Sequence, residues 1–177
     1  YVDYFKGKVV YCNCDDPRTS NFYKYFAVNF NELGLKKLIA SCYIEPKELD
    51  LVDSSSINAK GFYYEYTGSD NEKIIPDTCD LISFQGNGDF RNSESIALLQ
   101  QADMVITNPP FSLFREYISQ LVTYGKQFLV IGNINAITYK EIFGLIQEDK
   151  VWLGVNLGRG ISGFIVPQYY ELYGTET

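Results

Sequence analysis

Short apolar runs alternate with segments of helical periodicity over most of this 177-residue chain. Apolar runs bounded by turn residues are typical of buried strands, whereas apolar residues three or four positions apart are typical of a helix packed on a sheet. The pattern predicts strands at 8–12, 37–43, 61–66, 81–84, 103–107, 127–131, 151–153 and 161–166. It predicts helices that begin at Asn92, after Ser112 and at a capping box formed by Thr138 and Glu141. A further helix is predicted to begin at a cluster of Asp15, Asp16, Pro17, Thr19 and Ser20.

Strands that alternate with helices predict an α/β fold, in which a mostly parallel sheet carries helices on both faces. At this length we expect a single domain that covers residues 1–177. Because Tyr1 lies close to the first predicted strand, we also expect the chain to be a piece of a longer protein. In an open sheet of this kind, ligands bind outside the carboxyl ends of the strands.

The composition is that of an ordinary globular domain, with 46% hydrophobic and 21% charged residues. No apolar run approaches the roughly 20 residues of a membrane span, and no secretory leader is apparent. We therefore expect a cytoplasmic protein without a membrane partner. The formal net charge is −7, whereas a surface that binds DNA by itself is usually basic. Either the protein binds no nucleic acid, or the part that grips DNA lies elsewhere in the parent protein.

The absence of histidine restricts the chemistry that this chain can perform. It excludes Ser-His-Asp and Cys-His catalysis, and it excludes the zinc sites that contain histidine. The four cysteines, Cys12, Cys14, Cys42 and Cys79, form no Cys-x-x-Cys pair. We therefore expect no bound metal, and we expect reduced structural thiols in a cytosolic setting.

Polar clusters follow four of the predicted strands, at the end where ligands would bind. They are Asn13 to Asp16, Tyr43 to Glu45, Gly88 to Phe90 and Asn108 to Phe111. Four such clusters on one rim favour a binding site over ordinary loop polarity. A plainer interpretation of single turns stays open, because residues 13–16 could simply cap a helix and Glu45 could be a solvated loop acid.

The most distinctive cluster is Asn108-Pro109-Pro110-Phe111, at the end of an apolar run. The side-chain amide of Asn108 offers an oxygen that can accept from an amino group. The prolines stiffen the turn, because each fixes φ and keeps the preceding residue out of the helical region. Phe111 offers a ring on which a base can stack. The pattern predicts methylation of a planar exocyclic nitrogen, although a Pro-Pro after a strand can also be only a rigid turn.

The chain as a whole resembles the adenine-N6-specific DNA methyltransferases, and most closely the EcoRI-type modification methylases. The segments that carry the resemblance cover most of the chain: FKGKVVYCNCDDP at 5–17, LGLKKLI at 33–39, QGNGDFR at 85–91, TNPPFS at 107–112 and GNINAI at 132–137. The resemblance implies a Rossmann-like methyltransferase fold with S-adenosylmethionine as the methyl donor. It also implies that the acceptor is the N6 amino group of an adenine in double-stranded DNA, in a restriction-modification system.

The resemblance further implies roles for the Asn-Pro-Pro-Phe residues. Asn108 and the Pro109 carbonyl would hold the adenine amino group, in the rigid turn that Pro110 completes. Phe111 would stack on the adenine, which must be flipped out of the duplex before its amino group can reach the donor. Two acceptors would orient the amino nitrogen towards the sulfonium methyl, and this alignment supplies much of the rate.

Other residues would hold the donor, by the same resemblance. Asp89, with Phe90 beside it, would lie near the adenine of the donor or near the acceptor pocket. The turn that contains Asn13, Asp15 and Asp16 would face the amino acid part of the donor. Glu45 is the candidate for the ribose hydroxyls, since two hydroxyls suit a carboxylate.

Two departures from the family pattern leave alternatives open. Methyltransferases usually have a Gly-rich turn after the first strand, whereas residues 12–16 contain no glycine. The aromatic donor-binding segment that usually precedes this strand and a clear target-recognition region are also missing, so the chain alone could be inactive. The same motif occurs in enzymes that methylate an RNA base or a protein glutamine, usually with Tyr where Phe111 stands. A catalytically inactive binding module is the third alternative.

We predict that the 177-residue chain alone binds duplex DNA weakly, because its net charge of −7 repels the phosphates. Fluorescence anisotropy with a labelled duplex at physiological salt should give a dissociation constant in the micromolar range or weaker. A salt-dependent dissociation constant in the nanomolar range would instead reveal a basic face that the overall charge conceals.

Overall fold

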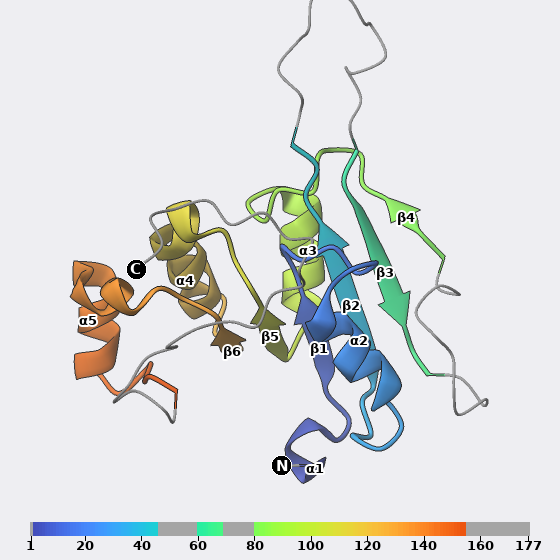
Figure 1. The fold of residues 1–177 in the computed structure, drawn as a ribbon, viewed down its shortest axis with the longest axis horizontal. Coiled ribbons are helices and arrows are strands. Elements are labelled where there is room, and N and C mark those ends of the chain that lie inside the picture. The colour runs from blue at the N-terminus through green and yellow to red at the C-terminus, as the bar shows by residue number, and fades with distance from the viewer. Residues whose placement is uncertain (1, 46–59, 69–79, 155–177) are drawn as a thin grey trace, which may run out of the picture.

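The computed structural model describes residues 2–45, 60–68 and 80–154, which contain one six-stranded sheet (Figure 1). The strands are β1 (Val9–Cys12), β2 (Lys37–Cys42), β3 (Phe62–Tyr66), β4 (Ile82–Ser83), β5 (Met104–Thr107) and β6 (Gln127–Val130). The α-helices are α1 (Val2–Phe5), α2 (Asn21–Val28), α3 (Ser93–Gln101), α4 (Phe114–Thr123) and α5 (Lys140–Gln147). Two 3-10 helices are η3 (Phe111–Leu113) and η4 (Ile134–Thr138).

The sheet has the order β4-β3-β2-β1-β5-β6 and is mostly parallel. β1 pairs in parallel with both β2 and β5, and β5 pairs in parallel with β6. β3 and β4 extend the sheet in antiparallel orientation at the other edge. The prediction of an α/β fold with a mostly parallel sheet is therefore confirmed.

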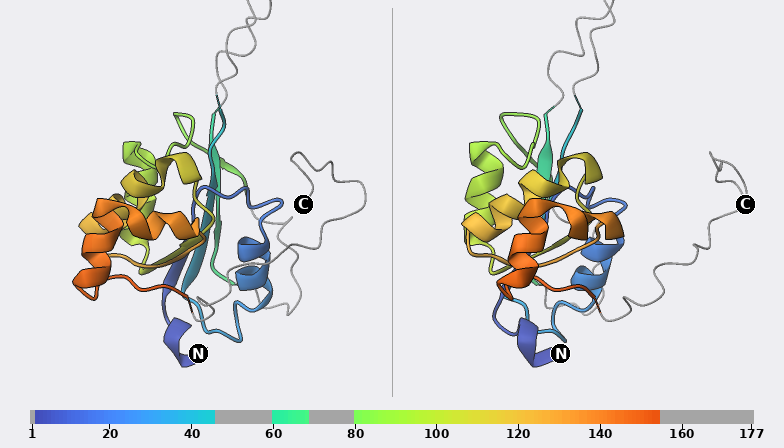
Figure 2. Two further views of the ribbon diagram at one scale, coloured as in Figure 1. Left: turned by 60° about the vertical axis from the view of Figure 1, so that its left-hand side comes forward. Right: turned by 90° about the vertical axis from the view of Figure 1, so that its left-hand side faces the viewer.

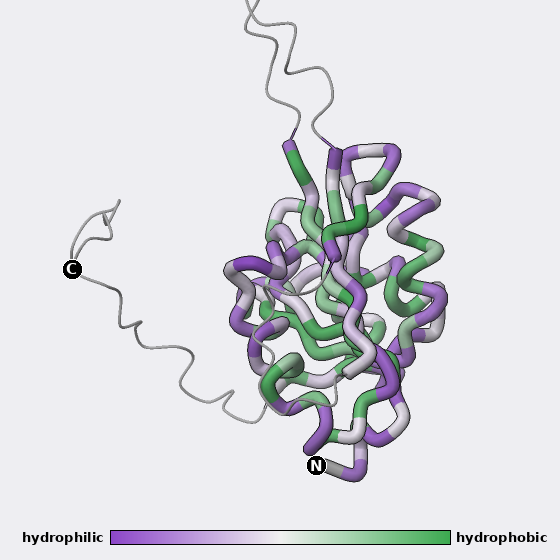
Figure 3. Tube along the Cα trace, turned by 90° about the vertical axis from the view of Figure 1, so that its right-hand side faces the viewer, coloured by the Kyte–Doolittle hydropathy of each residue, from purple (hydrophilic) through white to green (hydrophobic). Residues whose placement is uncertain are grey.

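Helices cover both faces of the sheet, as the two turned views show (Figure 2). Successive side chains of a strand point to opposite faces, and β1 shows the consequence. Val10 packs in the same buried cluster as Tyr23 and Phe26 of α2, whereas Tyr11 packs in a second cluster with Leu121 of α4. Because both faces are covered, the strand is apolar along its whole length instead of alternating. The apolar segments accordingly gather in the interior along the strands (Figure 3).

The helix start predicted at the cluster from Asp15 to Ser20 is confirmed, with Ser20 as the cap, since its hydroxyl accepts the Tyr23 N–H at 3.1 Å. Two other predicted caps are wrong. Ser112 lies inside the 3-10 turn η3, which the rigid Pro-Pro segment starts, and α4 begins only at Phe114. Thr138 ends η4, where its hydroxyl donates to the Asn135 carbonyl at 2.7 Å, and the N-cap position of α5 falls one residue later, on Tyr139.

The strand predicted at 151–153 is also wrong, because residues 151–154 form no regular element. The N–H groups of Lys150 and Val151 donate instead to the Leu145 carbonyl, at 2.9 and 3.3 Å, and close the end of α5. The strand predicted at 161–166 lies outside the described residues.

Gly88 allows the loop after β4 to lie against the end of β2. Its φ is +79°, and a Cβ at this position would lie 2.6 Å from the Cys42 carbonyl oxygen. Gly125 offers a matched comparison, because its φ is +62° but a Cβ there would meet open space.

We predict that Gly125→Ala lowers the free energy of unfolding by about 1–2 kcal/mol, the cost of a left-handed backbone for an L-residue. Gly88→Ala should cost clearly more, because the contact with Cys42 adds to the same backbone cost. Urea unfolding followed by circular dichroism measures both. Equal losses for the two variants would contradict the close approach at Gly88.

Candidate functional site

Four polar loops meet at one edge of the sheet. Because β1, β2, β5 and β6 are parallel, their carboxyl ends lie at the same edge. The loops that leave β1, β2 and β5 there contain residues 13–16, 43–45 and 108–111. The loop at 86–92 joins this edge, because the Asn87 carbonyl accepts the Ile44 N–H at 2.9 Å. The structure therefore brings together all four clusters that the sequence singled out.

Asn13 is the most deeply buried polar residue of these loops, with only 2% of its surface exposed. Its backbone carbonyl accepts from the Thr107 hydroxyl, and its Oδ1 accepts from the Tyr117 hydroxyl. Thr107 directly precedes Asn108, so Asn13 is bonded to the base of the Asn-Pro-Pro-Phe loop. The side chain of Asn13 points inward, and the predicted contact with a donor would involve its backbone or its neighbours in the turn.

Asp15 and Asp16 both lie in this turn, and both carboxylates already have partners. Asp15 accepts from the Ser20 hydroxyl at 2.6 Å, so it supports the residue that caps α2. The Asp16 carboxylate accepts bidentate hydrogen bonds from Arg18, whose Nε lies at 2.9 Å and whose Nη2 lies at 2.6 Å. The hydrogen bond from Arg18 lowers the pKa of Asp16 below its ordinary value. The residue that caps α2 is therefore Ser20, and residues 13–16 do not cap the helix themselves, although Asp15 is hydrogen-bonded to the capping hydroxyl.

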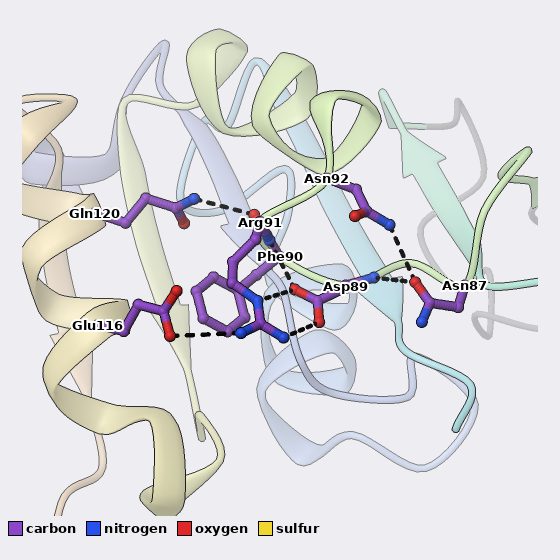
Figure 4. A network of polar contacts seen from close by, with 7 residues as sticks. All are labelled: Asn87, Asp89, Phe90, Arg91, Asn92, Glu116 and Gln120. Atoms are coloured by element: carbon purple, nitrogen blue, oxygen red, sulfur yellow. Dashed lines mark hydrogen bonds and ion pairs between the residues drawn. The ribbon is translucent and has the colours of Figure 1, made fainter. Parts of the chain in front are cut away.

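The loop at 86–92 carries a second aspartate that is held in the same way (Figure 4). Asp89 accepts from the backbone N–H of Arg91 at 2.9 Å, and from its Nε and Nη2 at 2.8 and 2.6 Å. The guanidinium also lies 5.4 Å from the centre of the Phe90 ring, and its Nη1 lies 3.5 Å from Glu116 of α4. The hydrogen bond from Arg91 is the main reason that the pKa of Asp89 is lowered.

Phe90 joins this loop to α4 through a ring contact and a backbone hydrogen bond. Its ring meets the Tyr117 ring edge-on, with 5.2 Å between the centroids and 80° between the planes. Its carbonyl accepts from Nε2 of Gln120 at 3.1 Å (Figure 4). Phe90, predicted near the donor, is therefore a buried side chain that packs on α4.

The Asn-Pro-Pro-Phe loop presents its two functional candidates to solvent. Asn108 is exposed, Pro109 is buried, and the side chain of Phe111 is 52% exposed. The loop is braced at both ends, because the Thr107 carbonyl accepts the Ile131 N–H at 3.2 Å and the Pro110 carbonyl accepts the Leu113 N–H at 3.1 Å. An exposed amide and an exposed ring on a stiff turn can contact a planar ligand without rearrangement.

A hollow of about 1230 Å³ runs along the face of β5 and β6, from Phe5 and Gln127 at the amino ends of the strands to Asp15 and Asn108 at their carboxyl ends. Asp15 and Asn108 contribute polar atoms to its lining, and Phe22, Ile106 and Leu129 contribute apolar ones. A cavity of this size accommodates a ligand larger than a single nucleoside. Glu45, the remaining predicted donor residue, is exposed beyond the end of β2.

The surroundings of the cysteines near the site disfavour the thiolate, which is the reactive form of the side chain. Burial raises the pKa of Cys14 to about 12, and the negative charges of Asp89 and Asp15 act in the same direction. Burial also raises the pKa of Cys42 to about 11. Within the described residues, no three His, Cys, Asp or Glu side chains group so that they could hold a metal ion, and no helix is long and apolar enough to cross a membrane. That the protein binds no metal stays a prediction.

Several residues that build this site were not identified as site residues from the sequence. Arg18 and Arg91 each follow an aspartate by two positions, and this Asp-x-Arg spacing was a signal that could have revealed both pairs. Thr107 and Tyr117 carried no such signal. Tyr117 stands among apolar residues at helical spacing, a pattern typical of a core position, and its hydroxyl contact joins residues 104 positions apart.

The family model of the adenine-specific methyltransferase EcoRI matches residues 1–177, the whole chain. The chain is 64% identical over 176 residues to the type II methyltransferase M.EcoRI of Escherichia coli, covering 99% of this chain and 53% of the relative. It is 39% identical to M.MpnI of Mycoplasma pneumoniae, covering 98% and 48% of the two chains, and 37% identical to M.MgeORF184P of Mycoplasma genitalium, covering 100% and 49%. The chain thus spans about half the length of these curated relatives. No solved structure gave a significant match.

We predict that the Asp89–Arg91 pair makes stability depend on pH. Because the folded-state pKa of Asp89 is lowered, its contribution is present above the ordinary carboxyl pKa of about 4 and is lost as the pH falls through the folded-state value. Asp89→Asn should therefore unfold at lower urea concentration than the wild type at pH 7, and the difference should shrink as the solution is acidified. A difference that stays constant from neutral to acid pH would exclude this contribution.

Proposed function

The chain belongs to the EcoRI family of adenine-specific methyltransferases, and we propose that it is the catalytic part of an enzyme that methylates adenine in double-stranded DNA. The methyl donor would be S-adenosylmethionine and the acceptor the N6 amino group. The observation that carries this proposal is the rigid Asn108–Phe111 loop, which exposes an aromatic ring and an amide, the amide at the lining of a large hollow. Because the family model matches the whole chain, the motif is not a chance occurrence.

The acceptor side follows from the two ends of this loop. Asn108 and the Pro109 carbonyl would accept the two hydrogens of the adenine amino group, which turns the nitrogen lone pair towards the sulfonium methyl. The nitrogen would attack the methyl carbon as the carbon–sulfur bond breaks, the donor would leave as the neutral thioether, and the methylated amino group would release one proton to water. Alignment replaces an imidazole base, which this chain lacks. Phe111 would hold the flipped adenine by stacking on its face.

The methyl donor would bind to the loops after β1, β2 and β4, as in a Rossmann-like methyltransferase fold. Asp15 is the best candidate for the ammonium group of the donor, because it lines the hollow and its carboxylate accepts from a neutral hydroxyl. Asp16 and Asp89 are paired with arginines, so they would shape the pocket through those pairs. Glu45 would bind the ribose hydroxyls from its exposed position.

The parent protein would bind DNA mainly through other regions. The net charge of −7 argues against a strong phosphate-binding surface on this chain, and the relatives extend over about twice its length. We expect the intact enzyme to work in the cytoplasm, where the buried thiols stay reduced. Its role would be the modification half of a restriction-modification system.

The proposal is tested with the intact gene product and tritium-labelled S-adenosylmethionine. Label should enter adenine of a duplex, and neither an RNA nor a glutamine-containing protein should accept it. Label in either of these alternative acceptors, without label in DNA, would assign the motif to a different substrate. A protein that binds the donor too weakly to titrate would instead be an inactive module.

We predict that Asn108→Ala lowers the rate of methyl transfer by roughly 100-fold or more, because small misplacements of a nucleophile are that costly. Phe111→Ala should lose about 1–3 kcal/mol of stacking, visible mainly as weaker capture of the flipped base. Phe143→Ala is the matched control, since this ring is also 52% exposed but lies on α5. Circular dichroism checks folding. An Asn108→Ala protein that folds and turns over normally would refute the mechanism.

A further inference from the structure

We propose that Tyr117 is a positioning residue that holds the turn after β1 in place against the Asn108 loop, and so aligns the donor with the acceptor. This inference rests on the proposed function and deepens it. It assigns a catalytic consequence to a buried hydroxyl that touches neither substrate. The argument starts from the two hydrogen bonds that converge on Asn13.

Asn13 connects the two halves of the site through these bonds. The Tyr117 hydroxyl donates to its side-chain Oδ1, and the Thr107 hydroxyl donates to its backbone carbonyl. Both donors are fully buried, and Asn13 is nearly so. A buried acceptor that loses its donor pays most of its desolvation cost, so the turn can leave this position only at a substantial penalty.

Tyr117 is placed to act on both sides of the site at once. It lies on α4, which continues directly from the Asn-Pro-Pro-Phe loop through the 3-10 turn η3. Its hydroxyl reaches the turn after β1, and its ring packs on Phe90 of the 86–92 loop. One side chain therefore contacts two of the proposed donor-binding loops from the helix that carries the proposed acceptor loop.

The hydroxyl is kept in the donating form. Burial raises the pKa of Tyr117 well above its ordinary value, so the group stays protonated at neutral pH. Removing only this oxygen, as in Tyr117→Phe, keeps the ring on Phe90 and frees the Asn13 side chain. Because methyl transfer needs the nitrogen, the methyl carbon and the sulfur in line, a shift of this turn should reduce the rate more than it reduces binding.

Tyr11 provides a matched control for a merely structural role. It is also fully buried, and its hydroxyl forms a 2.7 Å hydrogen bond with the Ser41 hydroxyl. This bond joins β1 to β2, which the parallel ladder already holds in register. Tyr11→Phe therefore removes a comparable buried hydrogen bond without releasing the turn that faces the Asn108 loop.

The experiment measures single-turnover methyl transfer to duplex DNA at saturating donor, with the intact wild-type protein, Tyr117→Phe and Tyr11→Phe. Thermal unfolding should show similar losses of stability for the two variants. The rate should fall roughly 10-fold or more for Tyr117→Phe with little change in KM for DNA, and it should stay near the wild-type rate for Tyr11→Phe. Equal rates for the two variants would overturn the inference, whether both are fast or both are slow.

Thr107 gives a second test that does not depend on how Tyr117→Phe folds. Thr107→Ser keeps the hydroxyl that donates to Asn13, whereas Thr107→Val keeps the shape and removes it. The serine variant should retain most of the rate and the valine variant should lose it; equal rates would overturn the inference. A wild-type protein that does not methylate adenine would be a separate result, since it overturns the proposed function on which this inference depends.

Discussion

The parallel pairing of β1 with both β2 and β5 is the constraint on which the site depends. It places the carboxyl ends of three strands side by side, so that loops distant in sequence leave the sheet at one edge. Backbone ladders, however, fix only where the loops begin. Their relative positions beyond the sheet are set by buried polar contacts, and the two hydroxyls that converge on Asn13 are the most enclosed of these.

The acids of this edge are held before any ligand arrives. Asp16 and Asp89 each form an ion pair with an arginine two positions later, and each arginine also lies over an aromatic ring. Such pairs fix the shape of a loop and remove much of its negative charge. Asp15 differs, because its partner is the hydroxyl that caps α2. The edge thus combines loops whose geometry is preformed by arginine pairs with an acid whose carboxylate contacts a hydroxyl.

Helix α4 supports the loops of the site through side-chain contacts. Its first residues follow the exposed Asn-Pro-Pro-Phe loop, and one side of it contacts the neighbouring loops through Glu116, Tyr117 and Gln120. The side chains of Asn108 and Phe111 can therefore stay exposed to solvent while the residues that support their loop are buried. This division explains how an exposed Asn108 can have a defined position without contacts of its own to the core.

Local sequence patterns were enough to predict the strands β1 to β6, the helix start near Ser20 and the Asn-Pro-Pro-Phe motif. These features are local, because burial on both faces makes a strand apolar throughout and a cap needs only its own first turn. Family resemblance extended this to the function and to the residues expected in the site. The caps at Ser112 and Thr138 and the strand at 151–153 failed, since neighbouring 3-10 turns and the end of α5 took up the same backbone and hydroxyl groups.

The partners of Asn13 and Tyr117, in contrast, follow from the packing of distant elements. Tyr117 looks like any apolar core position in the helical pattern, and Asn13 looks like a solvent-facing turn residue. Their hydrogen bond joins positions 104 residues apart and exists only because α4 packs on the face of β1 that carries Tyr11. Likewise, only the structure shows that β3 pairs with β2, and β4 with β3, in antiparallel orientation. Long-range pairing of this kind is a property of the topology, and no local pattern encodes it.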